Sequence, residues 1–193
     1  MLRAGGRVHA GAAALEPSAA IMIARTAPFC PQCGAPTEAR EKFGRSRPVC
    51  TRCGETVFFD PKVAVVAFVV RPALMGGDEL LMIERANDPG KGRWSLPAGF
   101  VDPDEAPAAA AERETLEETG LVVQAGRLIT VLHRPDPDGL ADLVLVYAAL
   151  WTGGNLCAGD DAAAVGWFGR DALPEIALAS THLLVTRWRS GDL

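Results

Sequence analysis

The sequence lacks any long apolar run. None of its 193 residues falls in an uninterrupted apolar stretch of the roughly 18 to 20 residues that a membrane-spanning helix needs. Near the start, Glu16 and Pro17 interrupt the only stretch that could form the core of a secretion signal. We therefore expect no membrane association and a cytoplasmic protein. Residues 1–26 are interpreted as a disordered tail, and translation from Met22 is the alternative.

An excess of positive charge is also missing. Lys and Arg number 19 against 24 Asp and Glu, which gives a formal net charge of −5. Without a basic stripe there is no counterion release to drive binding to a polyanion, so nucleic acid is not an expected partner. An anionic small molecule is still compatible with this charge, because bound divalent cations invert the local electrostatics.

The five cysteines are not spread along the chain as a disulfide framework would be. Cys30 and Cys33 form one C-x2-C pair and Cys50 and Cys53 a second, while Cys157 stands alone. This spacing is typical of a structural zinc site, in which four thiolates fill a tetrahedral coordination sphere. Two redox or chance pairs are the alternative. We expect residues 27–58 to form a small four-cysteine zinc ribbon that needs its metal to fold.

Hydrophobic periodicity after the ribbon alternates between strand and helix. The helix over Pro107–Thr119 is the clearest element, with proline suited to its first turn and Gly120 to its end. The other expected elements are strands over Val63–Val70, Leu80–Glu84, Trp94–Phe100, Leu128–Leu132, Leu143–Leu150 and Trp167–Phe168, and a helix over Leu178–Arg189. This order predicts an α/β sandwich with a mixed sheet over residues 59–193.

Three glutamates share one face of the predicted helix. Glu114, Glu117 and Glu118 are spaced i, i+3 and i+4, so their charges repel one another. They also lie near the helix C-terminus, where the macrodipole favours cations. Hard cations such as Mg²⁺ would compensate both penalties. The alternative is a solvated acidic helix end with Arg113 as a salt-bridge partner.

Residues at fixed sequence distances from these glutamates favour the metal site over the solvated helix end. Together they match the Nudix signature G-x5-E-x7-R-E-U-x-E-E-x-G-U, where U is a bulky aliphatic residue. Its fixed positions are occupied by Gly99, Glu105, Arg113, Glu114, Glu117, Glu118 and Gly120, and Leu121 fills the second aliphatic position. Thr115, at the first aliphatic position, is the one departure and affects packing rather than chemistry. The chain therefore resembles the Nudix hydrolases.

This resemblance implies a fold and a set of roles. The fold is an α/β/α sandwich, and the reaction is attack of metal-activated water on a diphosphate of a small nucleotide substrate. By position, Glu114, Glu117 and Glu118, with the backbone carbonyl of Ala98, are implied ligands of Mg²⁺ or Mn²⁺. Arg113 would orient the glutamates and Glu105 would brace the loop before the helix.

The four-cysteine ribbon narrows the expected class of substrate. A four-cysteine ribbon before a Nudix domain resembles the NADH pyrophosphatases and a group related to plant FAD and ADP-ribose pyrophosphatases. The S-Q-P-W-P-F-P motif of the NADH enzymes is absent from the region Leu132–Leu140, whereas Phe59–Lys62 and Leu178–Leu183 look more like the second group. We therefore expect an ADP-ribose- or FAD-like dinucleotide. The alternatives are an NADH pyrophosphatase, a non-catalytic nucleotide sensor and an enzyme for damaged nucleoside triphosphates.

Three further points stay open. Many Nudix relatives carry a glutamate shortly before a Trp-Phe pair, but Ala164 stands there, and we expect Asp160 and Asp161 to be solvated rather than to replace it. Arg85 is a candidate phosphate contact, because its guanidinium matches phosphate oxygens. For the oligomeric state, a homodimer is the alternative to a monomer.

Overall fold

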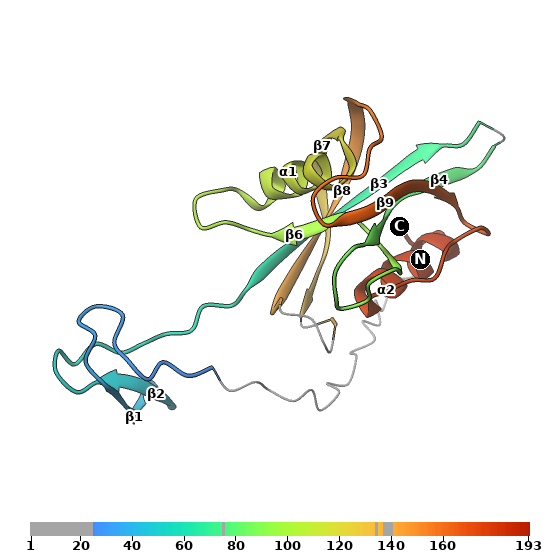
Figure 1. Cartoon of the computed structure of the whole chain (residues 1–193). Coiled ribbons are helices and arrows are strands. Elements are labelled where there is room, and N and C mark those ends of the chain that lie inside the picture. The colour runs from blue at the N-terminus through green and yellow to red at the C-terminus, as the bar shows by residue number, and fades with distance from the viewer. Residues whose placement is uncertain (1–24, 75, 134, 137–140) are drawn as a thin grey trace, which may run out of the picture. The chain divides into compact units, whose positions relative to one another are not determined.

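The computed structural model describes residues 25–74, 76–133, 135–136 and 141–193. The chain forms two compact units that meet in sequence between Phe59 and Asp60 (Figure 1). Most of the segment interpreted as a tail, residues 1–24, lies outside the described residues. Neither described helix is both long and apolar enough to cross a membrane.

The first unit is built around a hairpin that the sequence patterns did not predict. Strands β1 (Thr37–Lys42) and β2 (Arg45–Cys50) pair antiparallel through a two-residue turn. The turn residues Phe43 and Gly44 have φ angles of 53° and 71°, the left-handed conformation that twists a tight hairpin correctly. Cys30, Ala35 and Cys50 form the small buried cluster of this unit. Polar strands give no alternating apolar signal, which is why periodicity missed them.

The second unit is a seven-stranded sheet with one helix on each face (Figure 1). Its path is β5-β4-β3-β8-β7, with β6 paired to β3 and β9 paired to β4. Among the described strands, only β3 and β8 pair in parallel, so the sheet is mixed as predicted. The elements are β3 (Val63–Pro72), β4 (Asp78–Arg85), β5 (Trp94–Ser95), β6 (Ala98–Phe100), α1 (Pro107–Thr119), β7 (Leu121–His133), β8 (Leu143–Gly154), β9 (Ala162–Gly169) and α2 (Ala179–Ser190).

Strand β3 divides the core between the two helices. Its residues alternate in direction, as side chains on a strand must. Val65 and Val69 pack in one cluster with Ala110 of α1, whereas Phe68 packs in the other with Trp188 of α2. The near-continuous apolar sequence of β3 therefore reflects burial on both faces, and it fixes α1 against the sheet.

The predicted helix over Pro107–Thr119 is confirmed at both ends. Pro107 occupies its first turn, and Gly120, with φ of 68°, donates its amide to the carbonyl of Leu116. Strands β7, β8 and β9 are longer than predicted. Register shifts in β7 break its apolar alternation, and the alanines that begin β9 have low strand propensity. The local sequence therefore underestimates the length of these two strands, which pairing with their neighbours extends.

Candidate active site

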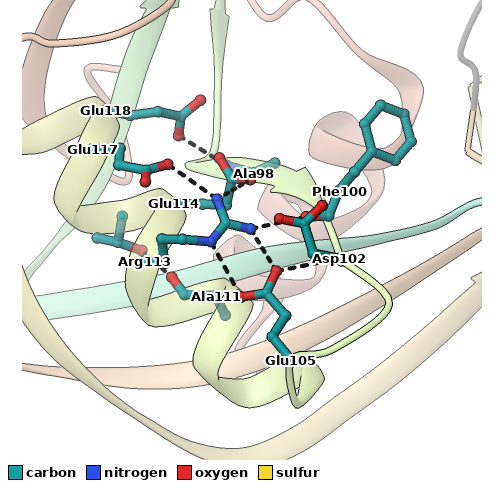
Figure 2. A network of polar contacts seen from close by, with 10 residues as sticks. Ala98, Phe100, Asp102, Glu105, Ala111, Arg113, Glu114, Glu117 and Glu118 are labelled. Atoms are coloured by element: carbon teal, nitrogen blue, oxygen red, sulfur yellow. Dashed lines mark hydrogen bonds and ion pairs between the residues drawn. The ribbon is translucent and has the colours of Figure 1, made fainter.

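Arg113 of α1 uses all five of its N–H donors in one network (Figure 2). Its Nε and Nη2 donate to the carboxylate of Glu105 at 3.1 and 2.6 Å. Its Nη1 donates to Glu114 at 2.8 Å and to Glu117 at 3.0 Å. Its Nη2 also donates to the carbonyl of Phe100 at 3.0 Å. One side chain thus joins the loop before α1 to two of the three glutamates.

Glu105 braces the loop before the helix. Besides Arg113, its carboxylate accepts the amide of Asp102 at 2.9 Å. The Arg113 hydrogen bonds, and then the Asp102 amide, hold the pKa of Glu105 below its usual range. Glu105 is therefore anionic in the folded protein and serves to position Arg113.

Glu114 passes directly over Gly99. A Cβ atom built on Gly99 would lie 1.9 Å from Cδ of Glu114, far inside van der Waals contact. Any side chain at position 99 would displace the carboxylate. Burial raises the pKa of Glu114, against the stabilising charge and hydrogen bond of Arg113. The motif therefore requires glycine at position 99 because the carboxylate of Glu114 fills the space that a side chain there would need.

Glu118 is the most buried of the three glutamates. It is 2% exposed, and its Oε2 accepts the amide of Ala98 at 3.0 Å (Figure 2). Burial raises the pKa of Glu118 to about 9, with further contributions from the neighbouring carboxyls of Asp161 and Glu114, although the Ala98 amide opposes the shift. A buried carboxylate with acidic neighbours requires a proton or a cation to compensate its charge.

The loop before β9 brings two more carboxylates to this place. Its backbone is attached to the end of α1, because the amide of Cys157 donates to the carbonyl of Thr119 and that of Gly159 to the carbonyl of Glu118, at 2.9 and 3.1 Å. Asp160 and Asp161 follow directly and line the same cavity as Glu114. The sequence favoured solvated side chains for these two residues over a role in place of the loop glutamate, whereas the structure places both on the cavity wall. Ala164, at the place where relatives carry a glutamate, pairs with Glu84 inside the sheet.

The cavity has a volume of about 460 Å³ and a strongly acidic wall. Arg85 and Arg113 are the cations on its lining. The acids that line it are Asp88, Asp102, Glu114, Asp136, Asp160 and Asp161. Arg85, at the end of β4, also donates its Nε to the carbonyl of Pro89 at 2.7 Å, which fixes its side chain at the rim. Such a wall repels a diphosphate unless divalent cations lie between them.

Thr115, the departure from the motif, is accommodated within the helix. It is fully buried, and its hydroxyl donates to the carbonyl of Ala111 at 2.7 Å. The Thr115 side chain is therefore buried without an unsatisfied polar atom, and its hydroxyl does not disturb the helix.

The four paired cysteines converge in the first unit. Their sulfur atoms all lie within 4.8 Å of one another, and three of the separations are 3.5, 3.6 and 3.7 Å. A tetrahedral zinc with bonds of about 2.3 Å places its sulfurs about 3.8 Å apart. The set can hold a tetrahedral metal ion.

Glu118→Gln should raise the thermal stability of the protein when no Mg²⁺ is added. A raised pKa means that folding favours the neutral form, so this residue contributes most below the carboxyl's usual pKa and loses that contribution as pH rises toward about 9. Glutamine stays neutral and can still accept the Ala98 amide. We expect the melting temperature of the variant to exceed that of wild type at pH 8, on the order of 2–4 °C for each kcal/mol gained. The gap should shrink at pH 5, and a variant that is less stable than wild type at pH 8 would contradict the assignment.

Comparisons with known proteins agree with this geometry. The NUDIX domain family model matches residues 60–188. An ADP-ribose pyrophosphatase of Methanocaldococcus jannaschii is 33% identical over 138 residues, which cover 70% of this chain and 79% of that protein. An NAD-capped RNA hydrolase NudC of Chromobacterium violaceum is 30% identical over 152 residues, covering 78% of this chain but only 53% of that protein.

Among solved structures, a NUDIX hydrolase from Nitrosomonas europaea superposes with a TM-score of 0.73 at 28% identity. The match covers 85% of this chain and 91% of that one. The family match, these relatives and the arginine–glutamate network lead to one assignment: the chain belongs to the Nudix family and is a Nudix pyrophosphohydrolase.

Proposed function

We propose that the protein hydrolyses the diphosphate of a nucleoside diphosphate linked to a second moiety, with divalent cations held by Glu114, Glu117, Glu118 and the Ala98 carbonyl. The acidic wall of the cavity carries this proposal, because six carboxylates, Glu114 among them, line the cavity and would repel an anionic substrate unless cations lay between them. The donors are all oxygens, as Mg²⁺ and Mn²⁺ prefer. Bound cations would lower the pKa of water and neutralise charge on the phosphates.

The residues around the proposed cations would have separate tasks. Arg113 holds one oxygen each of Glu114 and Glu117, which leaves their other oxygens for metal. Glu105 keeps Arg113 in place from the opposite side. Arg85 is the proposed contact to a substrate phosphate, since it lines the cavity with its guanidinium fixed at the rim.

A general base is proposed on the loop before β9. Asp161 lines the cavity, and its carboxyl contributes to the raised pKa of Glu118. Ala164 lacks a titratable group, so the family's loop glutamate has no counterpart at its own position. We propose that Asp161 accepts the proton of the attacking water, with Asp160 as the alternative.

ADP-ribose or FAD is the proposed substrate class. The similarity to an ADP-ribose pyrophosphatase over most of both chains supports it. Phe100 lines the cavity and is 44% exposed, and the ammonium of Lys62 lies 5.6 Å from its ring centroid. A substrate base is proposed to stack on the exposed part of this ring. The NudC relative, named as an NAD-capped RNA hydrolase, favours an NAD-type dinucleotide as the second candidate. A non-catalytic sensor has no need for the complete set of glutamates.

The four cysteines are the proposed ligands of one structural zinc ion. Their sulfur separations fit tetrahedral coordination, and four thiolates leave no open position for water. The proposed zinc therefore stabilises the first unit and takes no part in hydrolysis.

Glu118→Gln should abolish turnover while Glu112→Gln should not. Both changes replace one glutamate of α1 by its neutral isostere, but Glu112 accepts the amide of Ala125, outside the cavity. Release of AMP from ADP-ribose in Mg²⁺ is the measurement. A Glu118→Gln rate above about a tenth of wild type, a loss of less than roughly 1.4 kcal/mol of barrier, would contradict the metal role.

In the same assay Asp161→Asn should lower kcat more than Asp160→Asn; the reverse order would transfer the base to Asp160.

NADH should be hydrolysed more slowly than ADP-ribose or FAD. An enzyme distinguishes between dinucleotides through the groups that contact the half of the substrate in which they differ. A pocket whose polar groups hydrogen-bond that half of one dinucleotide leaves these groups unpaired when a different dinucleotide binds. The chain lacks the sequence element of the NADH enzymes. Values of kcat/KM at equal metal concentration measure the order. If NADH is the best substrate by about tenfold or more, a barrier difference of about 1.4 kcal/mol, the NADH alternative replaces this one.

A further inference from the structure

One face of the β1–β2 hairpin concentrates positive charge. Arg40 lies opposite Arg47, and Lys42 lies opposite Arg45. Residues directly opposite each other on paired strands point to the same side, and residues two apart along a strand do so too, so all four cations share one face. The acid on that face, Glu38, is paired with Arg40 at 3.2 Å.

Two phenylalanines extend this face at the tip of the hairpin. Phe43 and Phe58 stack with their ring centroids 5.9 Å apart and an interplanar angle of 29°. The guanidinium of Arg47 lies 4.7 Å from the centroid of the Phe58 ring. The two rings nevertheless remain 76% and 54% exposed. We call the surface formed by Arg40, Lys42, Arg45, Arg47, Phe43 and Phe58 the basic face.

The basic face is locally unfavourable for an isolated hairpin. Two like-charged pairs stand directly opposite each other, which destabilises a sheet. Phe43 has a φ of 53°, a left-handed conformation that is unusual for a bulky residue and favours Gly or Asn. Its side chain is then left in solvent. A partner that is anionic and planar would compensate the charge repulsion and cover the rings together.

We propose that the basic face binds single-stranded nucleic acid. Phosphates of the strand would lie against the four cations, and unpaired bases would stack on the phenylalanine rings, as they do on other single-strand binding surfaces. A bilayer surface fits less well, because the guanidinium over Phe58 would hinder burial of that ring in hydrocarbon. The surface belongs to the ribbon alone and does not depend on the proposed hydrolysis.

The overall charge conceals this surface. The whole chain carries a net charge of −5, which led us to expect no nucleic acid. Among the side chains of residues 27–59 other than the cysteines, five are cations, Arg40, Lys42, Arg45, Arg47 and Arg52, and three are acids, Glu38, Glu41 and Glu55. Four thiolates with one Zn²⁺ would add a charge of −2, so the positive character of the ribbon is a matter of where its cations lie and not of its total charge. Strand pairing then places four of the five cations on one side.

The test is fluorescence anisotropy of the full-length chain with labelled single-stranded RNA of about 12 nucleotides, without added Mg²⁺. A DNA strand of the same sequence, and vesicles containing phosphatidylserine, are parallel arms. We expect binding to the strands that weakens steeply with salt. Phe43→Asn, which suits the left-handed turn, and Phe58→Ala should each weaken binding by about fivefold or more, as loss of one stacked base predicts. Arg45→Gln should also lower the salt dependence.

Matched controls separate the basic face from general effects. Phe29→Ala removes another exposed phenylalanine of the ribbon, and Arg52→Gln removes its cation outside the hairpin strands. Both should bind as wild type does, and every variant should retain one zinc per chain. The proposal is overturned if Phe43→Asn and Phe58→Ala bind RNA like wild type, if the controls lose as much affinity, or if vesicles bind and neither strand does.

Discussion

The hydrogen bonding of Arg113 is the interaction on which the active site depends. A helix end with three like charges is unfavourable by itself, and its dipole adds to the cost. Arg113 neutralises part of that charge and, through Glu105 and the Phe100 carbonyl, fixes the loop on which Gly99 lies under Glu114. A lysine at this position would keep the charge but not the fork of five donors.

Glu118 is not included in the Arg113 network. It is buried, its carboxylate accepts the amide of Ala98, and the carboxyl of Asp161, from the loop before β9, contributes to its raised pKa. Among the described residues, the sulfur atoms of the four paired cysteines already lie close enough together to share one ion. The carboxylates of α1 do not form such a group, and Arg113 donates hydrogen bonds to two of them. Mg²⁺ keeps several of its waters, so the three glutamates need not converge on one ion as the cysteines do.

Much of the second unit could be predicted from the sequence, because its signals are local. The apolar strand β3, the proline and glycine at the ends of α1 and the spacing from Gly99 to Gly120 each fix a neighbouring piece of structure. The position of Asp160 and Asp161 could not be predicted in this way. It results from backbone hydrogen bonds between their loop and the end of α1, and no pattern of residue types encodes these bonds. The β1–β2 hairpin was missed for the related reason that its strands are polar.

If Arg113 arranges the glutamates for divalent cations, replacing it should lower the affinity for Mn²⁺, which electron paramagnetic resonance measures. Wild type, Arg113→Lys and Arg127→Lys should be titrated at the same pH; Arg127 lies on β7 and takes no part in the network. We expect unchanged affinity for Arg127→Lys and a loss of about 10- to 100-fold for Arg113→Lys, the effect of removing a group that orients metal ligands. Equal Mn²⁺ affinity in all three proteins would contradict this role of Arg113.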